Sequence, residues 1–67
     1  MDTERFLTEY EVADLLSVDV TTLRRWRREH TGPPYLRLGT CVRYDPIDLA
    51  AYIEAARVIH ETPNQRV

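Results

Sequence analysis

Apolar residues recur at helical spacing in three stretches of the chain and alternate with polar residues in a fourth. In the first stretch Thr8 and Glu11 have the spacing of a capping box, and Leu7 can pack on Val12 as a hydrophobic staple. A helix is therefore predicted to begin after Thr8 and to end near Ser17. Its expected buried stripe comprises Val12, Ala13, Leu15 and Leu16. Its expected solvated stripe comprises Glu9, Glu11 and Asp14.

The second helix is predicted to run roughly from Val20 to His30, with Asp19 as its N-cap. Leu23 and Trp26, with Val20 behind them, share one face and are expected to pack in a core. Stacking of Trp26 on a nucleic-acid base is the alternative, but its spacing from Leu23 favours packing.

The connection between these two helices is short. Only Ser17, Val18 and Asp19 separate them, so the second helix must leave the first at a steep angle, as in a helix-turn-helix. Ala13 allows close approach of the helices, and Val18 can plug the corner. An ordinary αα-hairpin has the same turn length. The arginines of the second helix are what favour a DNA-binding motif.

An extended segment follows the second helix. Thr31-Gly32-Pro33-Pro34 stops that helix, because Gly32 can terminate it and proline cannot continue it. Tyr35 to Leu38 and Val42 to Tyr44 then alternate as strands do, with Gly39-Thr40-Cys41 between them. These features predict a short β-hairpin.

Two registers can be written for this hairpin. A two-residue turn sets Arg37 opposite Val42 and Leu36 opposite Arg43, which mixes apolar and charged residues on each face. A three-residue loop puts every apolar residue on one side, and we expect this register. Its pairs are Leu38 with Val42, Arg37 with Arg43, and Leu36 with Tyr44. Facing arginines repel, so either an anion such as a DNA phosphate lies between them or they diverge into water.

A third helix is predicted to begin with Asp45 as N-cap and Pro46 at its first position. Asp48 and Glu54 are expected to point outward. The apolar residues expected to close the core are Leu49, Tyr52, Ile53, Ala56 and Ile59. We expect the 67 residues to form one domain, with an ordered core of about residues 6–59 and flexible ends before Phe6 and from His60 onward. The expected fold is mainly α with one small β-hairpin.

Charge is segregated along the chain. The formal net charge of −2 argues, by itself, against a nucleic-acid partner. Between Val20 and Tyr44, however, the sequence contains six arginines and one acidic residue, Glu29. The rest of the chain contains three arginines and ten acidic residues. The sequence therefore predicts a basic patch on an acidic body.

Several functional classes are disfavoured. Cys41 has no second cysteine to pair with, and His30 and His60 do not make a metal cluster. No nucleophile–base pair, carboxylate dyad or phosphate-cradling loop can be assembled, so we expect neither an enzyme nor a cofactor. No apolar run reaches the roughly 18 residues of a membrane span, and Met1 to Arg5 is not a basic region followed by an apolar stretch, so we expect no secretory signal. We expect a soluble cytoplasmic protein.

The second helix supplies the candidate DNA-binding residues. Arg24, Arg25 and Arg28 form a face with no compensating acid before Glu29, which favours contact with DNA over mere solvation. Arg27 lies nearer the buried flank and either reaches out to a phosphate or pairs with an acid of the first helix.

Taken together, these elements resemble the excisionases, or recombination directionality factors, of temperate phages. These are small winged-helix proteins related in fold to MerR-type regulators. The resemblance covers roughly residues 7 to 58. It is carried by Thr22 to Glu29, Gly32-Pro33-Pro34, Leu36 to Gly39, and Val42 to Tyr44. The same pattern occurs in AlpA-like transcription regulators of prophages.

The resemblance implies a winged helix-turn-helix protein that binds double-stranded DNA at repeated attachment-site sequences, bends it, and assists a tyrosine integrase in excision. It implies that Thr21, Thr22, Arg24, Arg25 and Arg28 contact bases and phosphates. Both threonines are alternatively plain first-turn residues. On the wing it implies contacts from Arg37, Thr40 and Arg43. Other copies of the protein are expected beside it on DNA, held by the acidic first and third helices against a neighbour's basic flank.

Two other functions are compatible with these residues. An AlpA-type transcription regulator at a promoter would use the same fold and the same arginines. A protein-interaction module would instead dock its arginine helix on an acidic partner and would have negligible affinity for DNA.

Overall fold

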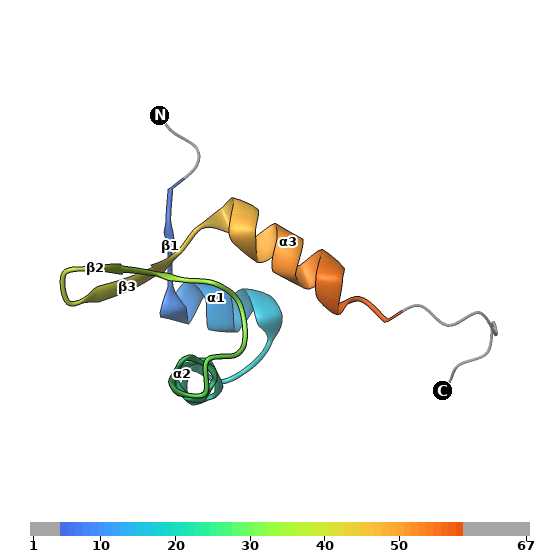
Figure 1. Ribbon diagram of the computed structural model, residues 1–67, viewed down its shortest axis with the longest axis horizontal. Helices are drawn as coiled ribbons and strands as arrows, with labels where there is room; N and C mark the ends of the chain where they lie inside the picture. The colour runs from blue at the N-terminus through green and yellow to red at the C-terminus, as the bar shows by residue number, and fades with distance from the viewer. Residues whose placement is uncertain (1–4, 59–67) are drawn as a thin grey trace.

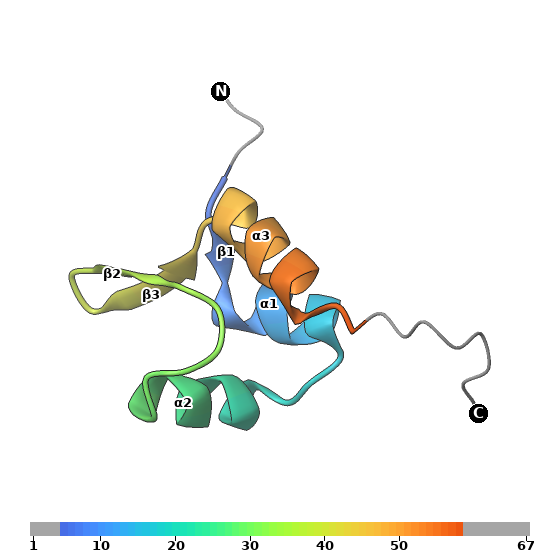
Figure 2. The same cartoon turned by 45° about the vertical axis from the view of Figure 1, so that its right-hand side comes forward.

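The computed structural model describes residues 5–58, so the predictions for Ile59 and for the tail from His60 lie outside the described residues. The elements in chain order are β1 (Leu7–Thr8), α1 (Glu9–Leu16), α2 (Val20–Arg28), β2 (Leu36–Leu38), β3 (Cys41–Tyr44) and α3 (Pro46–Ala56). In both Figure 1 and Figure 2, α1 lies between α2 and α3, and the β2–β3 hairpin projects beyond the helices. This is the predicted mainly α, winged helix-turn-helix architecture.

Helix α1 begins and ends where the sequence predicts. The Thr8 hydroxyl accepts a hydrogen bond from the Glu11 amide at 3.1 Å, and the Glu11 carboxylate accepts one from the Thr8 amide at 2.8 Å. This reciprocal pair is the predicted capping box. At the other end Ser17 has a left-handed φ of 58°, and the Val18 amide donates to the Ala13 carbonyl at 3.0 Å. These bonds satisfy carbonyls of the last turn and stop the helix.

The predicted faces of α1 are wrong at two positions. Leu15 is 62% exposed instead of buried, and Glu9 is largely covered instead of solvated, its side chain being 16% exposed. The reason is geometric: Glu9, Val12, Ala13 and Leu16 stand at i, i+3, i+4 and i+7, which is one face of a helix. Leu15 lies beside that stripe.

Helix α2 ends at Arg28, two residues before the predicted end at His30. His30 adopts a left-handed φ of 60°, and the Thr31 amide reaches back to the Trp26 carbonyl at 2.8 Å. The chain therefore leaves the helix in a Schellman-type turn built on a histidine, before Gly32. At the start of α2, Asp19 occupies the N-cap position as predicted, but its side chain makes no capping hydrogen bond.

Trp26 packs on the protein itself, as its spacing predicts. It lies against the buried cluster, and Gly32 approaches it from the loop after α2. A Cβ atom on Gly32 would lie 2.9 Å from the Trp26 Cβ, and the φ of Gly32 is +84°. Close approach and backbone conformation both require glycine at this position.

The hairpin register differs from the predicted one. Leu38 pairs with Cys41, Arg37 with Val42, and Leu36 with Arg43, so the turn contains two residues, Gly39 and Thr40. Gly39 has a φ of +66°, which suits the first central position of a type II′ turn, whose twist matches that of the strands. Arg37 and Arg43 therefore lie on opposite faces of the hairpin. The anion site predicted between them is wrong.

A third strand, which the sequence analysis missed, joins the hairpin to the helices. β1 pairs antiparallel with β3, setting Leu7 opposite Tyr44 and Thr8 opposite Arg43, and the strand order is β1-β3-β2. Residues directly opposite one another share a face, so Leu7 and Tyr44 point together toward the core. Because β1 leads directly into α1, the hairpin is fixed to the start of that helix.

The core is small and draws on four elements. Its buried members are Val12, Ala13, Leu23, Tyr44 and Leu49. Around them pack partly buried apolar side chains, among which Val18 fills the corner between α1 and α2 as predicted. Every element of the helix-turn-helix and the hairpin's second strand is thus held through a single cluster.

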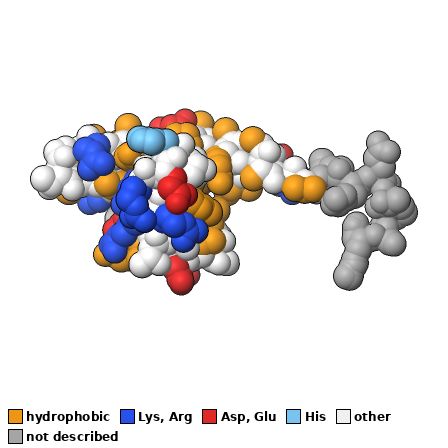
Figure 3. Space-filling view, turned by 60° about the horizontal axis from the view of Figure 1, so that its bottom comes forward, with side chains coloured by type: hydrophobic (Ala, Val, Ile, Leu, Met, Phe, Trp, Pro, Cys, Tyr) orange, Lys and Arg blue, Asp and Glu red, His pale blue; other side chains and the backbone are white. Residues whose placement is uncertain are grey.

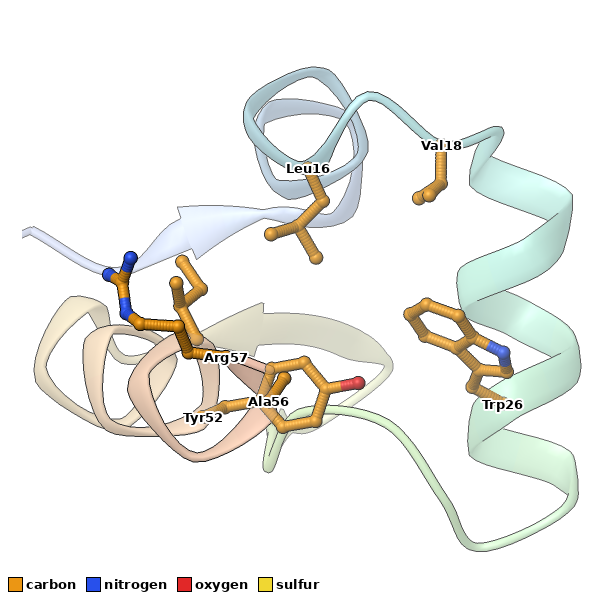
Figure 4. A pocket seen from close by; sticks show the side chains of 7 residues that line it. Leu16, Val18, Trp26, Tyr52, Ala56 and Arg57 are labelled. Atoms are coloured by element: carbon orange, nitrogen blue, oxygen red, sulfur yellow. The ribbon is translucent and has the colours of Figure 1, made fainter. Parts of the chain in front are cut away.

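Helix α3 begins as predicted but covers less of the core. The Asp45 carboxylate accepts a hydrogen bond from the Ile47 amide at 2.9 Å, and Pro46 occupies the first position. Leu49 is buried, but Ile53 is 38% exposed and Ala56 is exposed, against the prediction. Figure 4 shows the open groove that remains, about 330 Å³ in volume. Its lining residues are Leu16, Val18, Trp26, Tyr52, Ile53, Ala56 and Arg57.

Replacing Leu23 with alanine should destabilise the fold by about 2–5 kcal/mol, because Leu23 is fully buried and a cavity would remain. Chemical denaturation monitored by circular dichroism measures this change. Leu15→Ala is the matched control: the side chain is 62% exposed, so the change should stay within about 0.5 kcal/mol. Similar losses in the two variants would contradict the described core.

Candidate nucleic-acid interface

The outward face of α2 carries the arginines that the sequence analysis singled out. Arg24, Arg25 and Arg28 are exposed, and Thr21 is exposed near the start of the helix. Figure 3 shows basic side chains gathered on this side of the molecule, with acidic side chains beside them. Thr22 and Arg27 are half-buried on the flank. Most of the proposed helix contacts therefore share one accessible surface.

One carboxylate from α1 holds two of these arginines. The Glu9 carboxylate accepts hydrogen bonds from Arg24 Nη2 at 2.7 Å and Arg24 Nε at 3.3 Å. It also accepts one from Arg27 Nη2 at 3.0 Å. The steep crossing of α1 and α2 brings the first turn of α1 over the middle of α2. Of the two alternatives for Arg27, the structure shows the ion pair with an acid of the first helix.

Aromatic side chains complete the surroundings of both guanidinium groups. Arg24 Nη2 also donates to the Tyr10 hydroxyl at 3.1 Å, and its Cζ lies 5.8 Å from the centre of the Tyr10 ring. Arg27 Nη1 donates to the Tyr44 hydroxyl at 3.0 Å, and its Cζ lies 5.7 Å from the Tyr35 ring. Contacts of this kind orient a guanidinium as well as stabilise it.

The pKa shifts follow from this network. Hydrogen bonds from Arg24 lower the pKa of Glu9 below its ordinary value of 4.5, and Arg27 adds to the effect against an opposing contribution from burial. The bond to Glu9 raises the pKa of Arg24. Burial alone would lower the pKa of Arg27, but its bonds to Tyr44 and Glu9 outweigh it and raise the pKa. All three groups stay charged at neutral pH.

Arg25 and Arg28 are more loosely held than Arg24 and Arg27. Arg25 Nε lies 4.0 Å from the Glu29 carboxylate, and both side chains are at least half exposed, so this pair is weak. Within residues 5–58, no acidic side chain forms an ion pair with Arg28. Among the described residues, Arg25 and Arg28 are therefore the arginines of α2 that acidic side chains engage least.

The hairpin places its three candidate residues differently from one another. Arg37 is exposed, with its Cζ 6.0 Å from the Tyr35 ring, and Thr40 is exposed in the turn. Arg43 is half-buried on the other face of the hairpin, and its Nη1 donates to the Val42 carbonyl at 2.8 Å. Arg37 and Thr40 are therefore accessible on the wing, and Arg43 is directed back toward its own strand.

The sequence analysis offered an ion pair between Arg27 and an acid of the first helix, but it did not identify Glu9 as that acid or foresee the contacts of α1 with Arg24. Glu9 and Tyr10 both contact the arginines of α2, although neither was among the candidate residues. A signal for Glu9 was present, because it stands on the same helical face as Val12, Ala13 and Leu16. An acid on a buried stripe, opposite an arginine-rich helix, predicts an ion pair between them.

A helix-turn-helix whose second helix exposes arginines beside a two-stranded wing defines a class of DNA-binding protein. The comparisons agree: the family model described as "Helix-turn-helix domain" matches residues 6–57, and the chain belongs to that family. The family includes excisionase-like and AlpA-like DNA-binding proteins. No curated protein and no solved structure matches the chain. Within the described residues, no helix is long and apolar enough to span a membrane.

Glu9→Gln should lower the free energy of unfolding at pH 7 by about 1–3 kcal/mol, since the half-buried Arg27 loses a charged partner. The folded-state pKa of Glu9 is lowered, so its carboxylate stabilises the fold above pH 4.5 and this contribution is lost as the pH falls through the lowered pKa. The difference between the two proteins should therefore shrink in acid. Denaturation curves from pH 3 to 7 test this, and a difference that is constant across the range would contradict it.

Proposed function

We propose that this protein is an excisionase, a recombination directionality factor that binds repeated sites in attachment-site DNA cooperatively, bends that DNA, and assists a tyrosine integrase in prophage excision. The proposal adds a specific role to the DNA binding that the helix-turn-helix domain supports. The protein acts in this proposal by binding alone, without catalysis.

The observation that carries the proposal is the small number of cations that residues 5–58 of one copy can offer to DNA. Arg24 and Arg27 are engaged by Glu9, and the turn of the wing, Gly39 and Thr40, carries no charge. Few phosphate contacts mean weak binding by a single copy at physiological salt. Adjacent copies on repeated sites supply the missing affinity by raising the effective concentration of each next copy. Cooperative assembly on repeats is what an excisionase requires.

In the proposed complex α2 lies in the major groove. Thr21 and Thr22, near the N-terminal end of α2, face base edges, and Arg25 and Arg28 contact phosphates. Arg37 and Thr40 reach the adjacent backbone or minor groove from the wing. Asp14 and Asp48, which are exposed on α1 and α3, are available to the basic flank of a neighbouring copy.

The alternative is a transcription regulator of the AlpA type, which would use the same surface at a promoter. The family includes proteins of both kinds, so the two functions differ in the DNA that is bound and in the assembly on it. A regulator acting at one operator would not need a ladder of adjacent copies.

A gel-shift titration near physiological salt, across tiled duplexes from the gene's own chromosomal or phage neighbourhood, separates these functions. We expect a ladder of cooperative complexes on repeats beside an integrase attachment core. A single shift confined to a promoter would favour the regulator. Absence of any shift would overturn DNA binding and direct attention to an acidic protein partner.

Arg28→Ala should weaken binding to any duplex and reduce the salt dependence of log K by about 0.9, the value for one lost phosphate contact. Fluorescence anisotropy at several salt concentrations measures the slope. Arg57→Ala is the control, because it also removes one arginine, but at a position outside the candidate DNA-binding residues. Arg57 follows α3 and pairs with Glu54 at 2.7 Å. Equal slopes for wild type and Arg28→Ala would place the interface elsewhere.

A further inference from the structure

The Glu9 carboxylate of α1 accepts hydrogen bonds from two nitrogen atoms of Arg24, one of the candidate DNA-binding arginines of α2. A guanidinium has five N–H donors. The Arg24 Nε donor is bonded to Glu9 at 3.3 Å, and Nη2 is bonded to Glu9 at 2.7 Å and to the Tyr10 hydroxyl at 3.1 Å. Within the part of the chain that the structure describes, the two donors on Nη1 form no hydrogen bond and can serve an outside partner.

The charge of this cluster is as important as its geometry. Arg24, Arg27 and Glu9 together carry one net positive charge spread over two guanidinium groups. A backbone phosphate that approached Arg24 would meet the Glu9 carboxylate at hydrogen-bonding distance from the same guanidinium. Arg24 must then either lose its hydrogen bonds to Glu9 or bind the carboxylate and the phosphate together. Both outcomes reduce the free energy gained from the contact between Arg24 and the phosphate.

We propose that Glu9 is a specificity-determining residue that restrains Arg24 from indiscriminate contact with DNA phosphates and so limits non-specific binding. This inference rests on the proposed DNA-binding function. Glu9 acts through Arg24 and is a positioning residue. The number of arginines on α2 therefore exceeds the number of phosphate contacts that they make, because Arg24 is paired with a carboxylate from α1.

The side chain of Arg24 is suited to such a restraint. It is 43% exposed, so it can reach solvent and DNA once released, whereas the Arg27 side chain is 15% exposed and is also bonded to Tyr44. Removing the charge of Glu9 should therefore allow Arg24 to make one additional phosphate contact. Arg27 should remain hydrogen-bonded to Tyr44.

The test compares Glu9→Gln with wild type on a fluorescein-labelled 20-bp duplex of random sequence. Anisotropy titrations at pH 7.5 and several NaCl concentrations from 50 to 200 mM give the affinity and its salt dependence. Glu9→Gln should steepen the slope of log K against log[salt] by about 0.9 and tighten binding about eightfold at 0.1 M, as one added contact does.

Glu54→Gln is a matched control. Glu54 pairs with Arg57 through the same two bonds, at 2.7 and 3.3 Å, but on α3. Glu54→Gln changes the net charge of the protein by the same amount as Glu9→Gln. The comparison therefore separates the effect of the position of the lost charge from that of total charge. The Glu54→Gln slope should equal that of wild type.

Equal slopes for Glu9→Gln and Glu54→Gln would overturn the inference while leaving DNA binding intact. If wild type itself shows no affinity for the duplex, the proposed function falls and the inference falls with it. Circular dichroism establishes that each variant is folded at the temperature of the titration.

A second pair of variants keeps the test decisive if Glu9→Gln does not fold. Arg24→Gln and Arg28→Gln each remove one exposed arginine of α2, and Glu9 remains paired with Arg27 in both. Because Arg24 is already restrained, Arg24→Gln should reduce the salt slope by less than half the reduction caused by Arg28→Gln. Equal reductions would overturn the inference, and a purely structural role of Glu9 predicts that equality.

Discussion

The half-buried guanidinium of Arg27 joins the helix-turn-helix to the wing through polar contacts, in addition to the pairing of β1 with β3. It donates to Glu9 from α1 and to Tyr44 from β3, at 3.0 Å in both cases, and its Cζ lies 5.7 Å from the Tyr35 ring before β2. A charge held in a partly buried site must keep its partners, because an unpaired one costs free energy. The position of the hairpin relative to α2 therefore depends in part on Arg27, in the middle of the arginines of α2.

The apolar core supports this arrangement with few side chains. α1 contributes Val12 and Ala13, and α2, β3 and α3 contribute one buried residue each, among which Leu23 and Tyr44 are almost fully covered. Tyr44 serves twice, since its ring packs in the core and its hydroxyl accepts the bond from Arg27. Apolar packing and the polar network thus meet at one residue. A disturbance of either one should therefore reach the candidate DNA-binding surface of α2.

Local signals in the sequence predicted the elements well, and signals that depend on distant partners were less reliable. The capping box of Thr8 and Glu11 and the start at Asp45 and Pro46 were correct, because a cap depends on residues three or fewer positions apart. The hairpin register was wrong because the apolar pattern of two strands could not include β1, which pairs with β3 and sets Leu7 beside Tyr44.

The candidate site shows the same division. The exposed arginines of α2 followed from helical spacing, whereas the restraint of Arg24 and Arg27 depends on a residue 15 or more positions earlier in the chain. The end of α2 was placed late because His30 adopts a left-handed conformation that is favourable mainly for glycine. Burial of α3 was overestimated because periodicity shows which residues share a face and does not show how much of that face is covered.

In the proposed complex, the length of α2 limits how many base pairs one copy can read. Nine residues span about 14 Å, and this length lies along about four base pairs. Four base pairs distinguish about 250 sequences, whereas a genome offers on the order of a million competing positions or more. A sequence of about ten base pairs is needed to specify one locus among that many positions. At about four base pairs per helix, this corresponds to roughly three copies of α2 on adjacent sites. In the proposed complex, a repeated site lets several copies of α2 together read enough base pairs to specify one locus.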